Sequence, residues 1–431
     1  MALTSERDGH DFLSAAKAAG ASCALVSRHC PEIDFPQLLV SDTLKGLQQI
    51  AKAYRKLFRG KLIAITGSCG KTSTKDLLAG LLGDSHVHKT QGNLNNHIGV
   101  PLSILSLDLQ QHHFSVLEAG INHPGEMQVL ADIICPDSAV VTNVASAHLE
   151  GLGSEETVAG EKAKLLEAVA GSGRCYFHAD CLRYKPFERL ALRSTVITQQ
   201  TGKHAPDSFY ETIEYRNESL RVSSNTGRRI ALRRPVGPFS YFHIRSLSEG
   251  MLMNVALAVA IAQDCGVSDS DIQLRLLRWI PGNLRGTVIS EGSTRYYVDC
   301  YNANPVSMAD TIEYFASEFS ETPCVYVLAG MRELGVHSAE LHRQVGHKMR
   351  LRPEDRVYLL GNDAEAFAQG IIEAGNSSGA VHLCESLEQL REALVPLKSK
   401  PLSILLKGSR SYALEQLLPS TSLSSTVQHA C

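Results

Sequence analysis

The chain has 431 residues, of which 44% are hydrophobic and 20% charged, with a formal net charge of −3. This composition is typical of a globular protein with two or three domains and does not favour a nucleic-acid-binding or membrane surface. No two of the eleven cysteines form a C-x-x-C pair, so we expect core thiols in a reducing compartment rather than disulfides or a zinc site. The polar start and the lack of a long apolar stretch predict no signal peptide, no membrane span and a cytoplasmic location.

Residues 1–58 form a small unit. Helical patterns at 11–19 and 41–58 surround two short apolar strands at 23–27 and 37–40. This is little material for an independent core. We therefore expect a partial N-terminal α/β domain that leans on the domain after it.

Strands and helices alternate over residues 59–284, which predicts a parallel sheet covered on both faces. The expected strands are 61–66, 86–90, 113–119, 138–143 and 174–178. An antiparallel flap is expected at 209–215, 218–224 and 229–234, with turns at Arg216-Asn217-Glu218 and Asn225-Thr226-Gly227. Helices at 249–265 and 269–279 close this central domain, and Pro281-Gly282-Asn283 marks its boundary.

The alternation starts again in residues 285–431 and predicts a doubly wound, Rossmann-like domain. Expected strands are 294–300, 323–329, 355–360, 380–383 and 401–407, and expected helices are 306–319, 338–350, 363–374, 386–397 and 411–418. This domain lacks a glycine-rich phosphate loop of its own. The Ser/Thr-rich residues 420–431 are expected to fray.

A phosphate-binding loop is predicted at the start of the central domain. The apolar strand at 61–66 ends at Gly67-Ser68-Cys69-Gly70-Lys71-Thr72, and a helical pattern begins at Ser73. Backbone N–H groups at such a helix start face an anion, and glycines let the backbone approach it. Lys71 would reach the β- and γ-phosphates, and the Thr72 hydroxyl would hold Mg2+. The alternative is a strand-to-helix turn with a chance Gly-Lys-Thr.

Three further features are candidates for chemistry. Glu118 ends an apolar strand, where a carboxylate could hold Mg2+ opposite Thr72 or simply face water. The polar cluster Asn95, Asn96 and His97 could bind a polar substrate or be only a turn. His148 follows another strand and could be a metal ligand or a hydrogen-bonded structural residue.

Cys69 lies inside the loop at a helix start, where the pKa of a thiol tends to fall. It has no obvious histidine partner in the sequence, so we do not expect it to be a nucleophile. We do expect sensitivity to alkylation.

Together these residues resemble the Mur ligases, the ATP-dependent amide-forming enzymes of peptidoglycan synthesis. The similarity is greatest to the branch that joins D-alanyl-D-alanine to UDP-N-acetylmuramoyl-tripeptide. It rests on motifs spread over nearly the whole chain, among them TGSCGKTST (66–74), GNLNNHIGVPLS (92–103), EAGINHPGEM (118–127), NVASAHLEGLGS (143–154), EKAKLL (161–166), DCYNANPVSM (299–308), AGMRELGVHSAELHRQVG (329–346) and KGSRSYALE (407–415).

The resemblance implies roles for particular residues. It implies that Thr72, Glu118 and His148 contact Mg2+ and that Lys162 is carbamylated by CO2 and lies beside a second Mg2+. The implied catalytic residues are Lys71, Lys162, His148 and Arg285.

The resemblance also implies which residues hold nucleotide and substrate. The implied nucleotide-binding residues are Gly67, Ser68, Cys69, Gly70, Lys71, Thr72, Ser73, Asn254, Asp299 and Asn302, with Arg285 and Tyr301 closing over ATP. The implied substrate residues are Asn95, Asn96, His97, Asn304, Lys407 and Arg410.

The chain departs from the family pattern in two ways. Its start resembles the middle of the family's N-terminal domain, and glycines stand at 250 and 330, where a histidine and an aspartate are usual. Two other functions therefore stay open: a ligase of the same superfamily with other substrates, and a nucleotide-binding regulator that has lost catalysis. We expect a monomer.

Overall fold

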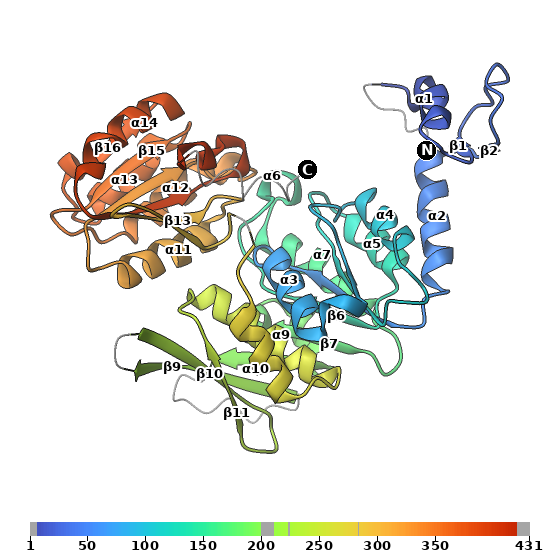
Figure 1. Cartoon of the computed structure of the whole chain (residues 1–431), viewed down its shortest axis with the longest axis horizontal. Coiled ribbons are helices and arrows are strands. Elements are labelled where there is room, and N and C mark those ends of the chain that lie inside the picture. Colours follow the sequence, from blue (N-terminus) through green and yellow to red (C-terminus); the bar gives the residue numbers. More distant parts are fainter. Residues whose placement is uncertain (1–6, 200–210, 223–224, 283, 420–431) are drawn as a thin grey trace.

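The chain folds into three units, each built on its own sheet (Figure 1). This computed structural model describes residues 7–199, 211–222, 225–282 and 284–419. The N-terminal unit (blue) and the C-terminal unit (orange to red) lie on opposite sides of the central unit (Figure 1). The class is α/β throughout, as predicted.

The N-terminal unit is small. Strands β1 (Ala24–Val26) and β2 (Gln37–Leu39) pair in parallel, and α1 (Leu13–Ala18) covers them. Helix α2 (Thr43–Arg55) then runs to the central unit (Figure 1). Its last residue, Arg55, is anchored there because Nη2 lies 2.8 Å from Asp137 Oδ2.

The central unit contains a nine-stranded sheet in the order β11-β10-β9-β8-β7-β6-β3-β5-β4. Pairing is parallel from β4 to β9 and antiparallel from β9 to β11. Its strands are β3 (Lys61–Thr66), β4 (Val87–Lys89), β5 (Phe114–Glu118), β6 (Ser138–Val141), β7 (Arg174–His178), β8 (Ser194–Gln199), β9 (Glu211–Val222), β10 (Asn225–Arg233) and β11 (Phe239–Ile244).

Helices cover both faces of this sheet. They are α3 (Lys71–Leu82), α4 (Gly99–Leu105), α5 (Glu126–Ile134), α6 (Leu149–Leu152), α7 (Glu155–Glu167), α8 (Lys185–Ala191), α9 (Glu249–Asp264) and α10 (Asp269–Arg278). One core joins α5, α7 and α8 to one face, and another joins α3, α9 and α10 to the other. Strand β3 is fully buried between them, because Leu62 to Ile65 are 0% exposed.

The C-terminal unit has a six-stranded sheet in the order β12-β13-β17-β14-β15-β16. Only β12 is antiparallel to its neighbour. The elements are β12 (Thr287–Glu291), β13 (Thr294–Asp299), α11 (Pro305–Glu318), β14 (Cys324–Ala329), α12 (Ser338–His347), β15 (Arg356–Leu360), α13 (Ala364–Glu373), β16 (Val381–Cys384), α14 (Leu387–Leu394) and β17 (Leu402–Lys407).

Four details of the expected fold are wrong. Strands β8, β11 and β12 were not predicted. The turn at Arg216-Asn217-Glu218 is instead the middle of the long strand β9, which pairs with β10 along its length. The helix expected at 411–418 is two short 3-10 turns, Arg410–Tyr412 and Leu414–Leu417. Asn225-Thr226-Gly227 begins strand β10 rather than forming a turn.

Some expectations cannot be compared with the structure. Asn283 of the predicted boundary and the tail at 420–431 lie outside the described residues. Within the described ranges, no helix combines the length and the apolar character that a membrane crossing needs.

Candidate active site

The predicted phosphate loop is present, between β3 and α3. Gly70 has a φ of +80° directly before the helix, a conformation that favours glycine. A Cβ on Gly70 would lie 2.6 Å from the side chain of Asn254 in α9, and a Cβ on Gly67 would lie 1.8 Å from Thr142 Oγ1. Both glycines are therefore required by close neighbours as well as by the turn.

The loop is fixed to the end of strand β6. Asn143 Oδ1 accepts hydrogen bonds from the backbone N–H of Ser68 and of Cys69, both at 3.0 Å. Thr142 Oγ1 donates to Cys69 O at 2.6 Å. The loop is thus held by a neighbouring strand end.

The environment of Cys69 contradicts the sequence expectation for its thiol. Burial raises the pKa of Cys69, although the hydrogen bond from Asn143 Nδ2 opposes the rise. The helix start does not outweigh the loss of solvent. Cys69 is thus a poor source of thiolate.

Lys71 points back over its own loop. Its Nζ donates to Gly67 O at 2.7 Å. Burial lowers the pKa of Lys71, and the nearby Glu118 carboxylate partly opposes this. The ammonium therefore lies in the loop, where a phosphate would be expected to contact it.

Thr72 and Glu118 meet as predicted. Thr72 Oγ1 donates to Glu118 Oε2 at 2.9 Å, and Asn95 Nδ2 donates to Glu118 Oε1 at 2.9 Å. Glu118 is 2% exposed. Strands β3 and β5 are parallel neighbours, so their carboxyl ends bring these groups to one edge.

The C-terminal unit reaches into the same site. Arg285 Nη2 donates to Thr72 Oγ1 at 3.1 Å, and its guanidinium carbon lies 3.8 Å from the centre of the Tyr301 ring. Cation–π stacking of this kind holds an arginine in place. Asn304, the N-cap of α11, directs Nδ2 at Ser68 O across 3.5 Å.

Behind this contact lies a buried lysine. Lys407 is 2% exposed, and its Nζ donates to Asp299 Oδ2 at 2.8 Å and to Asn302 O at 3.0 Å. Strands β13 and β17 are adjacent and parallel, which places the two ends side by side. The three residues form one connected polar group.

His148 lies at the contact between the central and C-terminal units, whereas Lys162 is buried inside the central unit. His148 caps α6 and pairs through Nδ1 with Glu333 of the C-terminal unit. Lys162, in α7, is 1% exposed, and its pKa is lowered well below the usual range by burial and by the charge of Lys71.

A cavity of about 620 Å3 joins these groups between the central and C-terminal units. Most predicted site residues line it: Ser68, Cys69, Gly70, Lys71, Thr72, Ser73, Asn95, Asn96, His97, Glu118, His148, Asn254, Arg285, Asp299, Asn302, Asn304 and Lys407. Gly67, Lys162 and Arg410 are not among its lining residues. Arg410 is exposed and pairs with Glu415.

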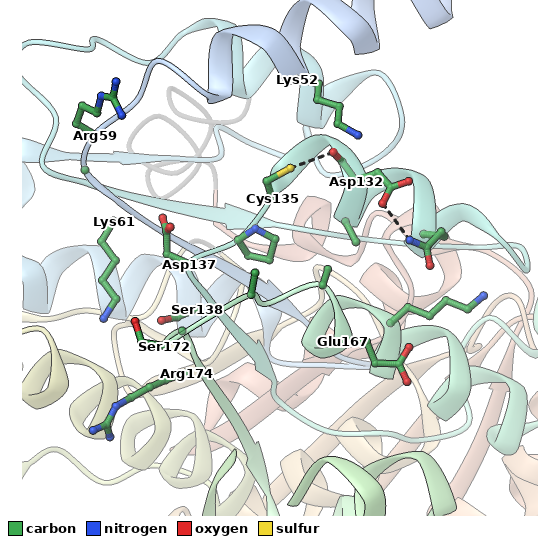
Figure 2. A pocket seen from close by; sticks show the side chains of 18 residues that line it. Lys52, Arg59, Lys61, Asp132, Cys135, Asp137, Ser138, Glu167, Ser172 and Arg174 are labelled. Atoms are coloured by element: carbon green, nitrogen blue, oxygen red, sulfur yellow. Dashed lines mark hydrogen bonds between the residues drawn. The ribbon is translucent and has the colours of Figure 1, made fainter. Parts of the chain in front are cut away.

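A second cavity, of about 780 Å3, lies at the opposite edge of the central sheet (Figure 2). It is lined by the first residues of three strands, Lys61, Ser138 and Arg174. Ligands of open α/β sheets bind at the carboxyl ends of the strands instead. The interdomain cavity is therefore the candidate active site.

The structure gives no complete metal shell from side chains alone. In the part of the chain that it describes, no three His, Cys, Asp or Glu side chains gather as a metal site would. The predicted set includes only two such residues, Glu118 and His148. Threonine and carboxylate oxygens do suit Mg2+, which often keeps water and substrate phosphate as its other ligands.

Comparison with known proteins places this site in a family. The family model for the Mur ligase middle domain matches residues 65–262, and that for the Mur ligase glutamate ligase domain matches residues 284–410. The chain is 31% identical to UDP-N-acetylmuramoyl-tripeptide--D-alanyl-D-alanine ligase of Bacillus subtilis, over 96% of this chain and 88% of the relative. The chain belongs to the Mur ligase family.

Other Mur ligases agree with this placement. The enzyme of the same name from Escherichia coli is 32% identical over 97% of this chain and 89% of its own. A crystal structure of MurF from Acinetobacter baumannii superposes with a TM-score of 0.82 at 27% identity, covering 96% of this chain and 88% of that one. The ADP complex of the Thermotoga maritima MurF ligase gives a TM-score of 0.79 at 25% identity, covering 96% and 92%.

The two glycines that depart from the Mur ligase pattern are each covered by another side chain. A Cβ on Gly250 would lie 2.8 Å from Asp310 Oδ2, and a Cβ on Gly330 would lie 2.7 Å from Tyr412 Oη. Gly250 N also donates to Asp310 Oδ1 at 3.0 Å. A larger residue at either position would therefore require the side chain of Asp310 or Tyr412 to move.

Sequence reasoning missed three residues at this site: Asn143, Asp310 and Glu333. Asn143 and Glu333 lie inside motifs that carry the Mur ligase resemblance, and that was the available signal. Asp310 follows such a motif in α11, and nothing in the sequence indicated its contact with Gly250.

Proposed function

We propose that this chain is an ATP-dependent ligase that joins D-alanyl-D-alanine to UDP-N-acetylmuramoyl-tripeptide. The observation that carries the proposal lies at the phosphate loop: Arg285 of the C-terminal unit donates to Thr72, and Thr72 in turn donates to Glu118, so that one site is assembled from two units. The relatives of that name cover nearly the whole chain. On this proposal, residues 1–58 belong to the UDP-substrate domain, 59–284 to the ATP domain and 285–431 to the ligase domain.

The reaction proceeds in two steps. A carboxylate oxygen of the tripeptide attacks the γ-phosphorus of ATP, the bond to the bridging oxygen breaks, and ADP leaves. The amine of D-alanyl-D-alanine then attacks the carbonyl carbon of the acyl phosphate. Phosphate leaves with its bonding pair, the amine loses a proton, and an amide remains.

The protein contributes position and charge to these steps. Lys71 and Arg285 offset the negative charge of the transferring phosphoryl group. Both are fixed before reaction, Lys71 by Gly67 O and Arg285 by stacking on Tyr301. Such preorganised donors cost little reorganisation when the charge develops.

Thr72 and Glu118 are the residues that would hold Mg2+. Their oxygens are hard donors, and Glu118 is buried with its two oxygens directed at Thr72 and Asn95. When bound, Mg2+ offsets phosphate charge and orients the transferring group. His148 is proposed as a further contact, and Asn254, next to Gly70, as a contact to adenine.

Lys162 is proposed to be carbamylated. Burial lowers the pKa of Lys162, which favours the neutral, nucleophilic form of its amine. The nitrogen attacks CO2 and releases a proton, which turns a group that would carry positive charge into an anion. An anion near Lys71 is electrostatically better placed than a second cation.

The remaining assignments belong to the same proposal. Asn95, Asn96, His97, Asn304 and Lys407 line the cavity as the substrate side. Arg410 would need to turn from Glu415 to contribute. Both walls of the cavity come from one chain, which supports a monomer. The use of ATP and a UDP-linked substrate supports a cytoplasmic location.

Phosphate release tests the function. The purified chain is given ATP, Mg2+ and UDP-N-acetylmuramoyl-tripeptide, with or without D-alanyl-D-alanine. We expect release only when both substrates are present, together with a product heavier by the dipeptide in mass spectrometry. Release without the tripeptide, or with other amines alone, would point to another ligase reaction, and no release at all would point to a nucleotide-binding regulator.

A further inference from the structure

The contact between His148 and Glu333 joins two residues with unusual backbones. His148 belongs to the central unit and has a φ of +57°, and Glu333 belongs to the C-terminal unit and has a φ of +65°. Left-handed conformations cost energy in residues other than glycine and persist only when their surroundings fix them. Here the two fix each other across the boundary between units.

The backbones around this pair are also in close contact. Glu150 N donates to Glu333 O at 3.1 Å. A Cβ on Gly335, whose φ is +57°, would lie 3.3 Å from Glu150 Cα. The turn that carries Glu333 is thus docked on α6, which lies beside the C-terminal unit in Figure 1.

The side chains complete the contact. His148 Nδ1 forms an ion-pair contact with Glu333 Oε2, and among the described residues this nitrogen has no hydrogen-bond partner besides that contact. Because one ring nitrogen is occupied, Nε2 is the nitrogen left for the cavity that His148 lines with Lys71 and Glu118. A carboxylate bonded to one nitrogen of a histidine sets which nitrogen carries the proton and how the ring is turned.

We propose that Glu333 is a positioning residue: when the two units close, it fixes the ring of His148 with Nδ1 protonated and Nε2 directed at the cavity. This inference rests on the ligase function proposed above. Glu333 is not among the residues that line the cavity. It makes the geometry of the central unit depend on the docking of the C-terminal unit.

The kinetic test compares two glutamates of the C-terminal unit. Glu333→Ala should lower kcat about ten- to a hundredfold, the usual cost of losing such a supporting carboxylate, with KM for ATP nearly unchanged. Glu333→Gln keeps the side-chain shape and an acceptor oxygen, so its kcat should lie between wild type and Glu333→Ala. Glu340→Ala is the matched control, since Glu340 is exposed and pairs with Arg343 away from the cavity.

A second readout needs no turnover. In protein labelled with 15N at histidine, the His148 ring signals are identified by their loss in His148→Ala. At pH 8 with the ATP analogue AMP-PNP and Mg2+, wild type should show Nδ1 protonated, and Glu333→Ala should show a mixture of the two neutral forms. Glu340→Ala should match wild type.

Each result decides the question. Equal kcat in Glu333→Ala and Glu340→Ala, or an unchanged His148 ring signal in Glu333→Ala, overturns the proposal. If Glu333→Ala does not fold, the same two measurements on the isosteric Glu333→Gln decide. If wild type forms no product, the ligase function fails, yet the ring signal still tests the pairing.

Discussion

At the scale of single residues, the polar side chains of the site form hydrogen bonds within the protein that a bound phosphate could replace. Lys71 donates to a carbonyl of its own loop, and Thr72 donates to Glu118. Each of these groups has a partner inside the protein, which limits the cost of burying it. The arrival of phosphate would exchange these bonds rather than create a charged site from nothing.

Removing the Lys71 ammonium should abolish useful turnover. A charge contact of this kind is worth about 3 kcal/mol of barrier, or roughly a hundredfold in rate. We expect Lys71→Ala to lose at least that much kcat while its circular dichroism stays that of wild type. Lys75→Ala is not an equivalent control, because Lys75 is buried and donates to Thr90 O. The exposed Lys56→Ala serves instead, and near-normal phosphate release by Lys71→Ala would refute the role.

Cys69 should react slowly with alkylating agents. Its raised pKa leaves little thiolate at pH 8, and the thiolate is the nucleophile. We expect iodoacetamide to modify the exposed Cys135 first, and the rate at Cys69 to keep rising above pH 9. Peptide mass spectrometry at several pH values measures both sites in one sample. Equal rates at Cys69 and Cys135 at pH 8 would show instead that the helix start dominates.

At the scale of elements, the sequence predicted the strands whose burial is continuous. Strand β3 is apolar from Leu62 to Ile65, and β14 and β17 are buried along their whole length. Two edge strands, β11 and β12, were missed, because they alternate only weakly between buried and exposed positions. The inner strand β8 was missed as well, whereas the edge strands β4 and β16 were predicted. Pairing with the next strand, β10, also extended β9 through a stretch with local turn signals, so strand pairing outweighed local preference there.

The site was predictable to the extent that it follows strand ends. Thr72 lies in the first turn of α3, just after β3 and its loop, and Glu118 ends β5. Because β3 and β5 are parallel neighbours, the meeting of the two residues follows from their positions. Contacts across the units do not follow in this way. Glu333 and Asp310 reach their partners His148 and Gly250 only because the units dock, and periodicity within one element carries no information about docking.

Two glycines near the phosphate loop should respond in opposite ways to alanine. Gly67→Ala places a methyl group against Thr142, so the loop must shift, and we expect nucleotide affinity to fall more than tenfold. Gly80, inside α3, has open space at its Cβ position. Gly80→Ala should therefore stabilise the helix by about 1 kcal/mol. Thermal unfolding and calorimetric titration with ATP measure the two effects, and a Gly67→Ala variant with normal affinity would contradict the loop geometry.

At the scale of the whole molecule, one helix carries much of the contact between the central and C-terminal units. Asp310, Tyr314 and Glu318 are spaced four residues apart on α11, so they share one face. That face bonds the start of α9 and the segment before it: Asp310 accepts from Gly250 N at 3.0 Å, Tyr314 Oη donates to Ser246 O at 3.1 Å, and Glu318 accepts from Ser246 Oγ at 2.7 Å. These bonds join the two units directly.

Weakening this face should therefore open the molecule. A typical hydrogen bond contributes about 1 kcal/mol, so the double variant Tyr314→Phe, Glu318→Gln should shift the balance between closed and open forms by up to about thirtyfold. Small-angle scattering should show wild type becoming more compact with AMP-PNP and UDP-N-acetylmuramoyl-tripeptide, and the double variant needing more ligand for the same change. Tyr241→Phe, on the exposed edge strand β11, is the matched control. Identical scattering profiles with and without ligand in wild type would mean that the two units do not move. The proposal that the site depends on closure of the units would then be wrong.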